Sequence, residues 1–505
     1  MTRDQFRFRR GLTWLTGDPN AINPGSILSM IQADRFQELV GVQSVVLLAT
    51  PSLAHFLELD VFMRPLMNYI YSDLRTKTGA QELRVKSVAA VVDVLPEPPA
   101  EEESNGHPAT SEGLALLFSS ASSHGTPNYL TSPDESEAIT LEFSSSRTPV
   151  VESKFPRSTV RHVTLPVANT IFVNGNRTTL LEDSWEVKFH DSAPTITHQG
   201  RRPLKSFQID MNCSPNDFLS GSVPLKPLTG PRKVVRSMGN VLAQIEVDGK
   251  PVPASRELEK AVTQYTSSHP TRAYRGPIQV FALVRPPGSS HSESHDTRKD
   301  EEHTGSILAE LWQDARLFKV TGGGGGWGKK QGLLSLDTAV DFGRDEATVG
   351  FPDFETALDL SHNMGSHGMI PQDGTVQFFL YTEDAERRIR SGKSSHDAVT
   401  PAGRTQNSQT SFILGTASNP DTQEYPDIVP TEEKKSGGSF YPNLFGMASY
   451  GGAALRTDKV SVPERAGGQH LTSSRTRLDV PDSRFVLRAL PESGSSLSRA
   501  GDEQD

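Results

Sequence analysis

The chain of 505 residues is 35% hydrophobic and contains 41 Gly and 35 Pro. This apolar share is low for a compact protein, so we expect about 300 ordered residues interrupted by solvated segments. The formal net charge of -10 argues against nucleic acid or an anionic membrane as the main partner, because either would need clustered Lys and Arg. The single cysteine, Cys213, excludes an intramolecular disulfide framework and favours a reducing compartment.

Residues 1–40 are interpreted as an N-terminal extension that ends in a helix. The opening MTRDQFRFRR carries four arginines among aromatic residues, a composition also found in mitochondrial presequences, although Asp4 and Asp18 oppose this reading. We therefore expect an intracellular, cytoplasmic protein, with the mitochondrion as the alternative. Ser26 precedes a run with near-helical apolar spacing, which predicts a capped amphipathic helix over 27–40.

The next segment predicts a layer of helices and strands. VQSVVLLA, residues 42–49, is a continuous aliphatic run of strand length, and a second helical pattern extends from Leu53 to about Leu74. A strand that is apolar on both faces needs cover on both faces, which an α/β layer provides. The apolar run from Leu39 to Ala49 is too short to span a bilayer, so we expect no transmembrane segment.

From Leu83 onward the sequence has short apolar runs separated by turn-forming residues, which is typical of strands. Strands are expected at 83–96, 114–120, 138–146, 160–173 and 184–190. Two gaps between these runs, near 97–111 and 119–137, are rich in Pro, Ser and acidic residues and have no apolar period. We interpret them as long disordered insertions.

A further block, residues 232–262, predicts a hairpin followed by a helix. The hairpin turns at Met238–Asn240, Asp248-Gly249 forms a tight turn, and Ser255 can cap a helix that begins at Arg256. Another strand is expected at 277–285. We expect VVLLA and VLAQIEV, residues 45–49 and 241–247, to lie in one common sheet of a single domain over 41–285. The predicted fold class is therefore α/β, with a mixed sheet and N-terminal helices packed on it.

The remainder of the chain divides into three expected parts. Residues 286–305 are interpreted as a disordered linker, and residues 306–390 as the C-terminal part of the fold. Residues 391–505 are mostly Ser, Gly, Thr and charge, so we expect a largely disordered tail. This tail contains one aromatic island, SFYPNLFGMASY, at 439–450.

The hairpin and helix block resembles the FIST sensory-domain family. GNVLAQIEVDGKPVPASRELEKAV, residues 239–262, is similar to that family's strand, Asp-Gly turn and Pro-Ala helix start, although Val252-Pro253 interrupts the direct Pro-Ala step. VVLLATPSLAHFLE, VDVLP and EGLALLFS also fit the family pattern, which extends loosely from Val45 to Val284. The resemblance implies a small-molecule sensing module. No F-box-like segment precedes Gln43, so it does not imply a ubiquitin-ligase role. The Gly-rich Trp-Gly-Lys-Lys segment is similar to uncharacterised fungal proteins.

The run TGGGGGWGKK, residues 321–330, satisfies most of the phosphate-loop pattern GxxxxGK[ST]. Glycines allow successive amides to face an anion, and a lysine adds charge. Lys330, however, replaces the hydroxyl residue that would hold magnesium, and Gly332 weakens a following helix. We interpret this segment first as a structural loop. Contact with a ligand through its amides and lysines is the second alternative, and a nucleotide site is the third. The candidate ligand-binding residues are Gly323, Gly324, Gly325, Gly326, Trp327, Gly328, Lys329 and Lys330.

Other polar residues give weaker signals. Asn169 and Thr170 interrupt an apolar strand, so they either bond to nearby backbone or line a pocket. His362 and His367 are five residues apart and share no helical face, so no metal site is expected. Glu246 and Asp248 are interpreted as a carboxylate pair with one member in solvent. Glu182 and Asp183 are a further pair of neighbouring carboxylates with no assigned role, and His198 is interpreted as a loop residue.

The sequence favours a non-catalytic sensory or signalling module that binds a small polar metabolite and has a protein partner. No catalytic residue, metal or cofactor is assigned, and enzymatic activity is not favoured. One alternative is a nucleotide- or phosphate-binding protein that uses Gly323–Lys329. Another is an interaction scaffold whose disordered segments, including the island Tyr441–Tyr450, fold on contact with partners.

Overall fold

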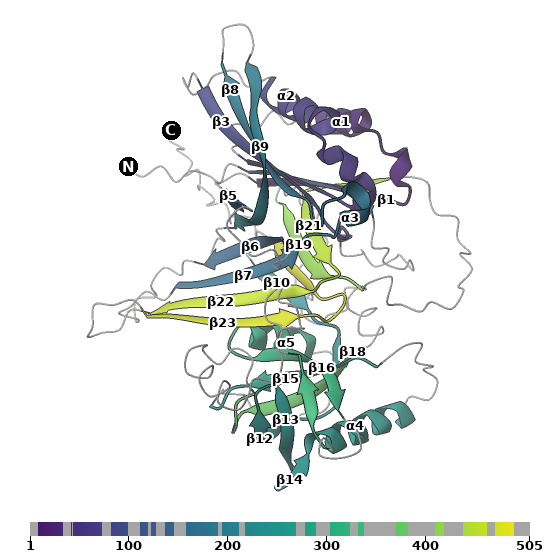
Figure 1. Cartoon of the computed structure of the whole chain (residues 1–505), viewed down its shortest axis with the longest axis vertical. Helices are drawn as coiled ribbons and strands as arrows, with labels where there is room; N and C mark the ends of the chain where they lie inside the picture. The colour runs from purple at the N-terminus through teal and green to yellow at the C-terminus, as the bar shows by residue number, and fades with distance from the viewer. Residues whose placement is uncertain are drawn as a thin grey trace, which may run out of the picture.

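The computed structural model describes residues 9–33, 42, 44–72, 82–98, 112–119, 123–127, 137–145, 158–189, 194–211, 218–268, 278–288, 303–323, 332–337, 370–381, 410–418, 438–461 and 470–488. Within these residues the chain forms three β-sheets with a small number of helices. The N-terminal helices lie at one end of the longest axis of the molecule and a barrel lies at the other, with the four-stranded sheet beside the large sheet between them (Figure 1).

The largest sheet is mixed, as predicted, because β2 and β3 pair in parallel, as do β6 and β9, while its other pairs are antiparallel. Its described strands, in spatial order, are β20 (Ser439–Pro442), β1 (Arg9–Thr16), β4 (Glu112–Ser119), β2 (Ser44–Ala49), β3 (Glu82–Val91), β8 (Leu180–Lys188), β9 (Thr195–Asp210), β6 (Ala138–Ser145), β7 (Ser158–Pro166), β22 (Ala453–Ser461) and β23 (His470–Leu478), with β5 (Ser123–Pro127) pairing with β9.

The N-terminal helices cover one face of this sheet, also as predicted. After the short turn η1 (Pro19–Ala21), they are α1 (Pro24–Ala33), the 3-10 helix η3 (Pro51–Leu57), the π-helix η4 (Leu59–Met63) and α2 (Arg64–Ser72). Helix α1 begins earlier than its predicted start after Ser26. Asn23 Oδ1 accepts a hydrogen bond from the Gly25 amide at 2.8 Å, so Asn23 satisfies an amide that the first turn leaves free.

Strand β2 shows why the sheet needs cover on both faces. Val45 and Leu47 pack among the helices, whereas Val46 and Leu48 belong to the core on the opposite side. Successive strand residues point to opposite faces, so a continuous aliphatic run buries both of its sides. The prediction of a doubly covered strand at this position is confirmed.

A four-stranded sheet covers much of the opposite face. Its described strands are β10 (Phe218–Ser222), β24 (Arg484–Arg488), β19 (Ser411–Thr416) and β21 (Leu444–Ser449), in that order. Phe412, Phe445 and Phe485 from these strands share one core with Val46 and Leu48. The C-terminal part of the chain is therefore built into the centre of the protein.

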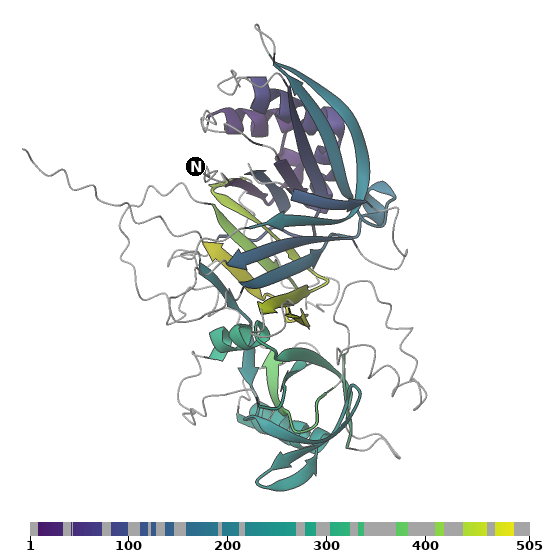
Figure 2. The same cartoon turned by 90° about the vertical axis from the view of Figure 1, so that its left-hand side faces the viewer.

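The third sheet closes into a six-stranded barrel, because β18 pairs with both β15 and β12 (Figure 2). Its strands in order are β18 (Thr375–Tyr381), β12 (Arg232–Met238), β13 (Val241–Val247), β17 (Leu334–Leu336), β16 (Arg316–Gly323) and β15 (Val280–Arg285), and β11 (Leu225–Pro227) and β14 (Lys250–Pro253) extend it. Helix α4 (Ala254–Ser268) packs Leu258 and Tyr265 against this barrel's core.

The barrel is joined to the rest of the protein through its outer surface. Phe281 and Phe379 face outward from β15 and β18 into the central core. Helix α5 (His303–Leu311) adds a polar connection, since the buried Arg285 donates to Glu310 at 2.5 Å and to Gln377 at 2.9 Å. The side chain of Arg285 is only 5% exposed, so this ion pair helps to position the barrel against α5.

The structure corrects the expected domain organisation. VVLLA lies in β2 of the large sheet and VLAQIEV lies in β13 of the barrel, so they do not share a sheet. Both runs are apolar and of strand length, and neither property specifies the strand with which a run pairs. Within the barrel, β15 pairs with β16 and β18, which lie in residues 306–390, the range expected to form the C-terminal part of the fold.

The expected tail and the insertion expected near 119–137 are wrong where the structure describes them, while the insertion expected near 97–111 lies almost entirely outside the described residues. Strands β19 to β24 all lie within 391–505, and β5 lies within the insertion expected at 119–137. Strand β1 occupies the expected N-terminal extension, and α5 begins inside the linker expected at 286–305. The aromatic island contributes β21, in which every residue is buried, so its apolar side chains serve the core.

Candidate functional site

A cavity of about 200 Å³ lies at one end of the barrel, between α4 and β16. Its described lining comes from four barrel elements: Ser255, Leu258 and Glu259 on α4, Ile278 and Val280 at β15, Val320, Thr321, Gly322 and Gly323 on β16, and Leu334 on β17. This cavity brings the helix of the FIST-like block together with the start of the glycine run. Two motifs that are about 60 residues apart in sequence thus meet at one site.

The position of α4 follows from the hairpin before it. Asp248 and Gly249 adopt positive φ angles of 51° and 74°, which suits the tight turn predicted for this pair. The turn returns the chain as β14 along β13, and α4 begins directly after β14. The amide of Ser255 donates to the Gly332 carbonyl at 3.4 Å, which holds the first turn of the helix beside β17.

The two described glycines of β16 differ in their surroundings. A Cβ atom on Gly323 would lie 2.3 Å from Leu334 Cδ2 and 3.0 Å from the Leu333 carbonyl oxygen, so glycine is required by close packing. A Cβ atom on Gly322 would meet no atom within 4 Å. Gly323 therefore has a structural role at the end of β16, while Gly322 leaves open space at the rim.

The cavity wall combines aliphatic side chains with polar groups. Leu258, Val280 and Leu334 are buried beneath it, and Ile278 is 38% exposed at its rim. The hydroxyl of Thr321 donates to the Ser335 carbonyl at 3.3 Å. Among the described lining residues, Glu259 is the only one with a charged side chain. Such a wall suits a small ligand with an apolar body and one polar end.

The structure separates the predicted ligand-binding residues. Gly323 lies at the cavity, and the other seven members of the run, Gly324, Gly325, Gly326, Trp327, Gly328, Lys329 and Lys330, lie outside the described residues. Asn169 and Thr170 are elsewhere, in the turn after β7. His362, His367 and Cys213 also lie outside the described residues.

Asn169 and Thr170 shape a local turn and do not line the cavity. Asn169 Oδ1 accepts from the Ile171 amide at 3.0 Å, and the buried Thr170 hydroxyl donates to the Asn176 carbonyl at 2.8 Å. They lead into the short helix α3 (Ile171–Asn174), which ends at Gly175 with φ 79°. The segment IFV, predicted as strand, is thus helical, and bonding to nearby backbone is the role that the structure gives this polar pair.

Helix α3 presents an unusual apolar surface, which we call the α3 knob: Ile171, Phe172 and Val173. Phe172 is fully exposed, and its two neighbours are 43% and 45% exposed. The turn that carries the knob is held by side-chain hydrogen bonds, including Asn174 to Thr179 at 2.9 Å. Three consecutive apolar side chains held in solvent are not explained by the packing of the turn itself.

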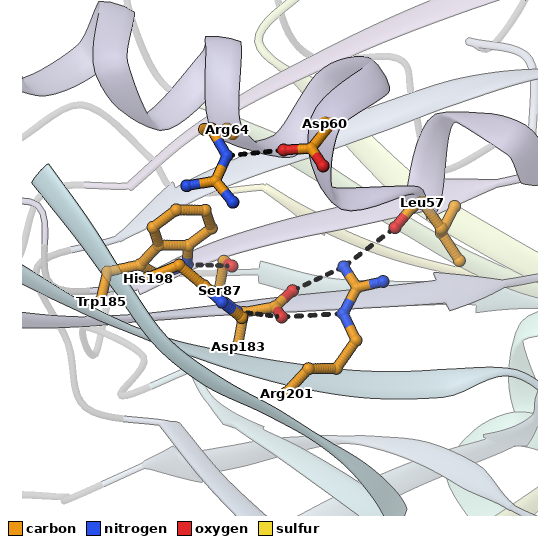
Figure 3. A network of polar contacts seen from close by, with 8 residues as sticks. All are labelled: Leu57, Asp60, Arg64, Ser87, Asp183, Trp185, His198 and Arg201. Carbon is orange, nitrogen blue, oxygen red and sulfur yellow. Dashed lines mark hydrogen bonds and ion pairs between the residues drawn. The ribbon is translucent and has the colours of Figure 1, made fainter.

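A buried polar network in the large sheet was missed by the sequence analysis (Figure 3). Asp183 on β8 accepts hydrogen bonds from Arg201 Nε at 2.8 Å and from Arg201 Nη2 at 2.9 Å, and His198 Nε2 lies 2.9 Å from Asp183 Oδ1. Arg201 Nη2 also donates to the Leu57 carbonyl at the end of η3, 3.0 Å away. The network therefore ties the sheet to its covering helices.

Trp185 completes this network. Its ring meets that of His198 edge-on, with centroids 4.9 Å apart, and its Nε1 donates to Ser87 Oγ at 2.8 Å. On the other face of β8, the buried Glu182 accepts from Arg202 Nε at 2.9 Å. Glu182 and Asp183, to which the sequence assigned no role, are thus buried ion-pair partners, and His198 lies on β9 and not in a loop.

A signal for these pairs was present in the sequence. The consecutive acids of LLEDSWEV and the consecutive bases of HQGRRPL lie on neighbouring antiparallel strands, in the register Glu182↔Arg202 and Asp183↔Arg201. Two acids inside a mostly apolar strand need partners when the strand is buried. The adjacent bases of β9 supply these partners, and Lys86 on β3, on the other side of β8, adds a second partner for Glu182 at 3.3 Å.

A second histidine lies among charged groups farther along the sheet. His162 on β7 is 5% exposed, with Nε2 3.1 Å from Asp458 Oδ2 and Nδ1 3.5 Å from Glu142 Oε2. Burial lowers the pKa of the His162 imidazole, and the nearby Arg456 lowers it further. Burial, with the charge of Asp210, raises the pKa of Glu142. These groups connect β22 to β7 and β6, and no cavity is described beside them.

Neither a metal site nor a membrane-crossing helix is found in the part of the chain that the structure describes. No group of three or more His, Cys, Asp or Glu in those residues is placed to hold a metal ion. None of the described helices is both long and apolar enough to cross a bilayer. Comparisons of the chain with protein-family models, with curated proteins and with solved structures give no match.

Proposed function

We propose that the protein is a non-catalytic small-molecule-binding module of FIST-like sensory type, with its ligand site in the cavity between α4 and β16. The cavity itself is the observation that carries this proposal: it combines aliphatic side chains with polar groups. Two of the segments that the sequence singled out, the hairpin–helix block and the glycine run, contribute to it. The proposal places the protein inside the cell, as its single cysteine favours.

Ligand binding would act by shifting the population of conformations at this end of the barrel. A ligand that contacts both α4 and β16 binds best when the two elements are held together, so it stabilises that arrangement. A partner that recognises the same surface would then bind with altered affinity. No covalent step is required, which fits the absence of an assigned catalytic residue.

A thermal-stability screen against metabolites tests the proposal, because any ligand of the folded state raises the melting temperature. Each hit is repeated with Gly322→Phe, which adds a ring at the cavity rim where a side chain has open space. Gly230→Phe is the matched control, since Gly230 also has open space around its Cβ position but does not line the cavity. Ligands of the cavity should lose their effect only in Gly322→Phe. A hit that stabilises both variants equally binds elsewhere and counts against the site.

The phosphate-binding alternative is tested with the same protein. Glu259, the charged residue of the described wall, would repel a nucleotide, so we place this alternative second. Titration calorimetry with ATP and magnesium should give no heat. Binding that disappears in a Lys329→Ala, Lys330→Ala double variant would reverse the order of the two proposals.

The α3 knob favours a protein-interaction role as a second candidate function. Phe172 is fully exposed on a hydrogen-bonded turn, and a rigid apolar anchor loses little conformational entropy on binding. The test compares proteins recovered from cells with the intact chain, with Phe172→Ser and with Val235→Ser, which changes another exposed apolar residue. A partner lost only with Phe172→Ser supports the role. Equal recovery with all three chains contradicts it.

A further inference from the structure

The charge of the cavity wall points to the kind of ligand it would hold. From its one carboxylate and the aliphatic side chains beside it, we infer that the cavity takes a small organic cation, such as a primary amine on a short branched hydrocarbon, and rejects anions and zwitterions. This inference rests on the proposed ligand-binding function and adds the chemical class of the ligand.

Glu259 is the first support for a cationic ligand. It is an exposed residue in the second turn of α4, its side chain lines the cavity, and it forms no ion pair with any described residue. Glu257 on the same helix, by contrast, is paired with Arg232 at 3.0 Å. An ammonium group beside Glu259 would make a charge-assisted hydrogen bond, whereas a carboxylate or phosphate there would meet repulsion.

One amide at the start of α4 is already occupied. A free helix N-terminus attracts anions through its unpaired amides and its dipole. Here the Ser255 amide at the cavity already donates to the Gly332 carbonyl. The described wall therefore presents a carboxylate to a ligand and has no basic side chain to balance it.

The apolar part of the wall indicates which hydrocarbon group of a ligand would fit the cavity. Leu258, Val280 and Leu334 form its floor, while Ile278 leaves 38% of its surface in solvent at the rim. A short branched hydrocarbon would bury this surface, and burial of apolar area favours binding. A volume of about 200 Å³ is smaller than pockets that take drug-sized molecules, so a compact ligand fits best.

Four probes that share one carbon skeleton separate charge from shape. They are 3-methylbutylamine, 3-methylbutan-1-ol, 3-methylbutanoate and leucine, which is the same amine with an added carboxylate. Binding is measured by ligand-observed NMR and by thermal shift at neutral pH. We expect the amine to bind about tenfold more tightly than the alcohol, since hydrogen bonds to charged groups are worth roughly that factor. The butanoate and leucine should bind more weakly than the alcohol.

Two variants assign the preference to one side chain. Glu259→Gln should remove the tenfold advantage of the amine and leave the alcohol unchanged. Glu246→Gln changes the net charge equally on an exposed residue of the same barrel, and it should keep the advantage. An amine advantage that survives Glu259→Gln would overturn the inference.

The outcomes also distinguish this inference from the proposed function. Equal binding of all four probes, abolished by Gly322→Phe, would overturn the cationic preference and support the cavity as a ligand site. Butanoate or leucine binding as tightly as the amine would do the same. Failure of the amine to bind at about 10 mM, a concentration that detects very weak ligands, would also overturn the inference, and the metabolite screen would then decide the proposed function separately.

Discussion

Asp183 and Arg201 form a two-point ion pair inside the large sheet, with Arg201 Nε and Nη2 each donating to a different carboxylate oxygen. The Asp183 side chain is fully buried and that of Arg201 is 28% exposed. Because Arg201 also donates to the Leu57 carbonyl, the pair orients η3 over the sheet. The network around Asp183 thus links secondary structures that are distant in sequence.

Removing one member of this pair should strongly destabilise the fold. Asp183→Asn leaves a guanidinium without its counter-charge, and breaking a buried pair costs about 3 kcal/mol. Arg201→Met leaves the buried carboxylate and should cost a similar amount. The double variant should cost less than the sum, because each single change already breaks the pair. Urea unfolding of all three measures these free energies.

The control for this prediction is Glu82→Gln. Glu82 pairs with Arg84 on the surface of β3, where the two side chains are 41% and 87% exposed. Exposed pairs contribute at most about 1 kcal/mol, so this variant should remain close to the wild type. Additive effects in the Asp183 and Arg201 double variant would show that the two residues stabilise the protein independently.

A second prediction concerns the role of the C-terminal strands in folding. A chain that ends at residue 390 lacks β19 to β24, which supply Phe412, Phe445 and Phe485 to the central core. We expect this chain to be insoluble or to lack a cooperative unfolding transition. A chain that ends at residue 488 keeps every described strand and should unfold like the full protein. Soluble yield and thermal unfolding compare the two, and a folded shorter chain would contradict the structural role of these strands.

The sequence could predict elements whose signals are local. The aliphatic run of β2 required two covered faces wherever it was placed, and the Asp248-Gly249 turn required a hairpin. Helix α4 followed because its start has helix-forming residues directly after that hairpin. In each of these cases, the residues that decide the structure lie within a few positions of one another.

The C-terminal strands could not be predicted in this way. In β22, AALRTDKVS, Leu455 faces the core while Arg456 and Asp458 face His162. The strand therefore looks half polar in sequence, and its partner β7 is about 300 residues away. Likewise, Glu259 lines the cavity only because α4 lies beside β16, and neither segment alone predicts that contact. Pairings over long distances supply this information.

The burial of Asp93 allows a prediction of how the stability of the fold depends on pH. Burial raises the pKa of this carboxyl, although Ser449 Oγ and the Tyr450 amide donate to it at 2.8 and 2.9 Å. The folded state therefore holds its proton more tightly than the unfolded state. The stability gained from this protonation is complete below the ordinary aspartate pKa of about 3.9 and is lost as pH rises through the higher folded value.

Asp93→Asn should remove that dependence, because an amide oxygen can still accept both hydrogen bonds and carries no charge. At pH 7 the variant should be at least as stable as the wild type, and its advantage should shrink as pH falls towards about 4. Free energies of unfolding at several pH values provide the measurement. Asp60→Asn, which alters a carboxylate that is 80% exposed, controls for the loss of one negative charge. An Asp93→Asn variant that is less stable at every pH would contradict the effect of burial.

The neighbouring glycines of β16 should respond in opposite ways to the same substitution. In Gly323→Ala the new methyl group would lie 2.3 Å from the buried Leu334 side chain and 3.0 Å from the Leu333 carbonyl oxygen, so β17 must shift. Such overpacking costs about 1–3 kcal/mol. Gly322→Ala places its methyl group in open space and should change stability by no more than about 0.5 kcal/mol. Because alanine has the same effect on the unfolded chain at both positions, the difference between the variants isolates the contact with β17. Urea unfolding of the two proteins measures it, and equal stabilities would mean that Gly323 does not pack against Leu334 at the cavity.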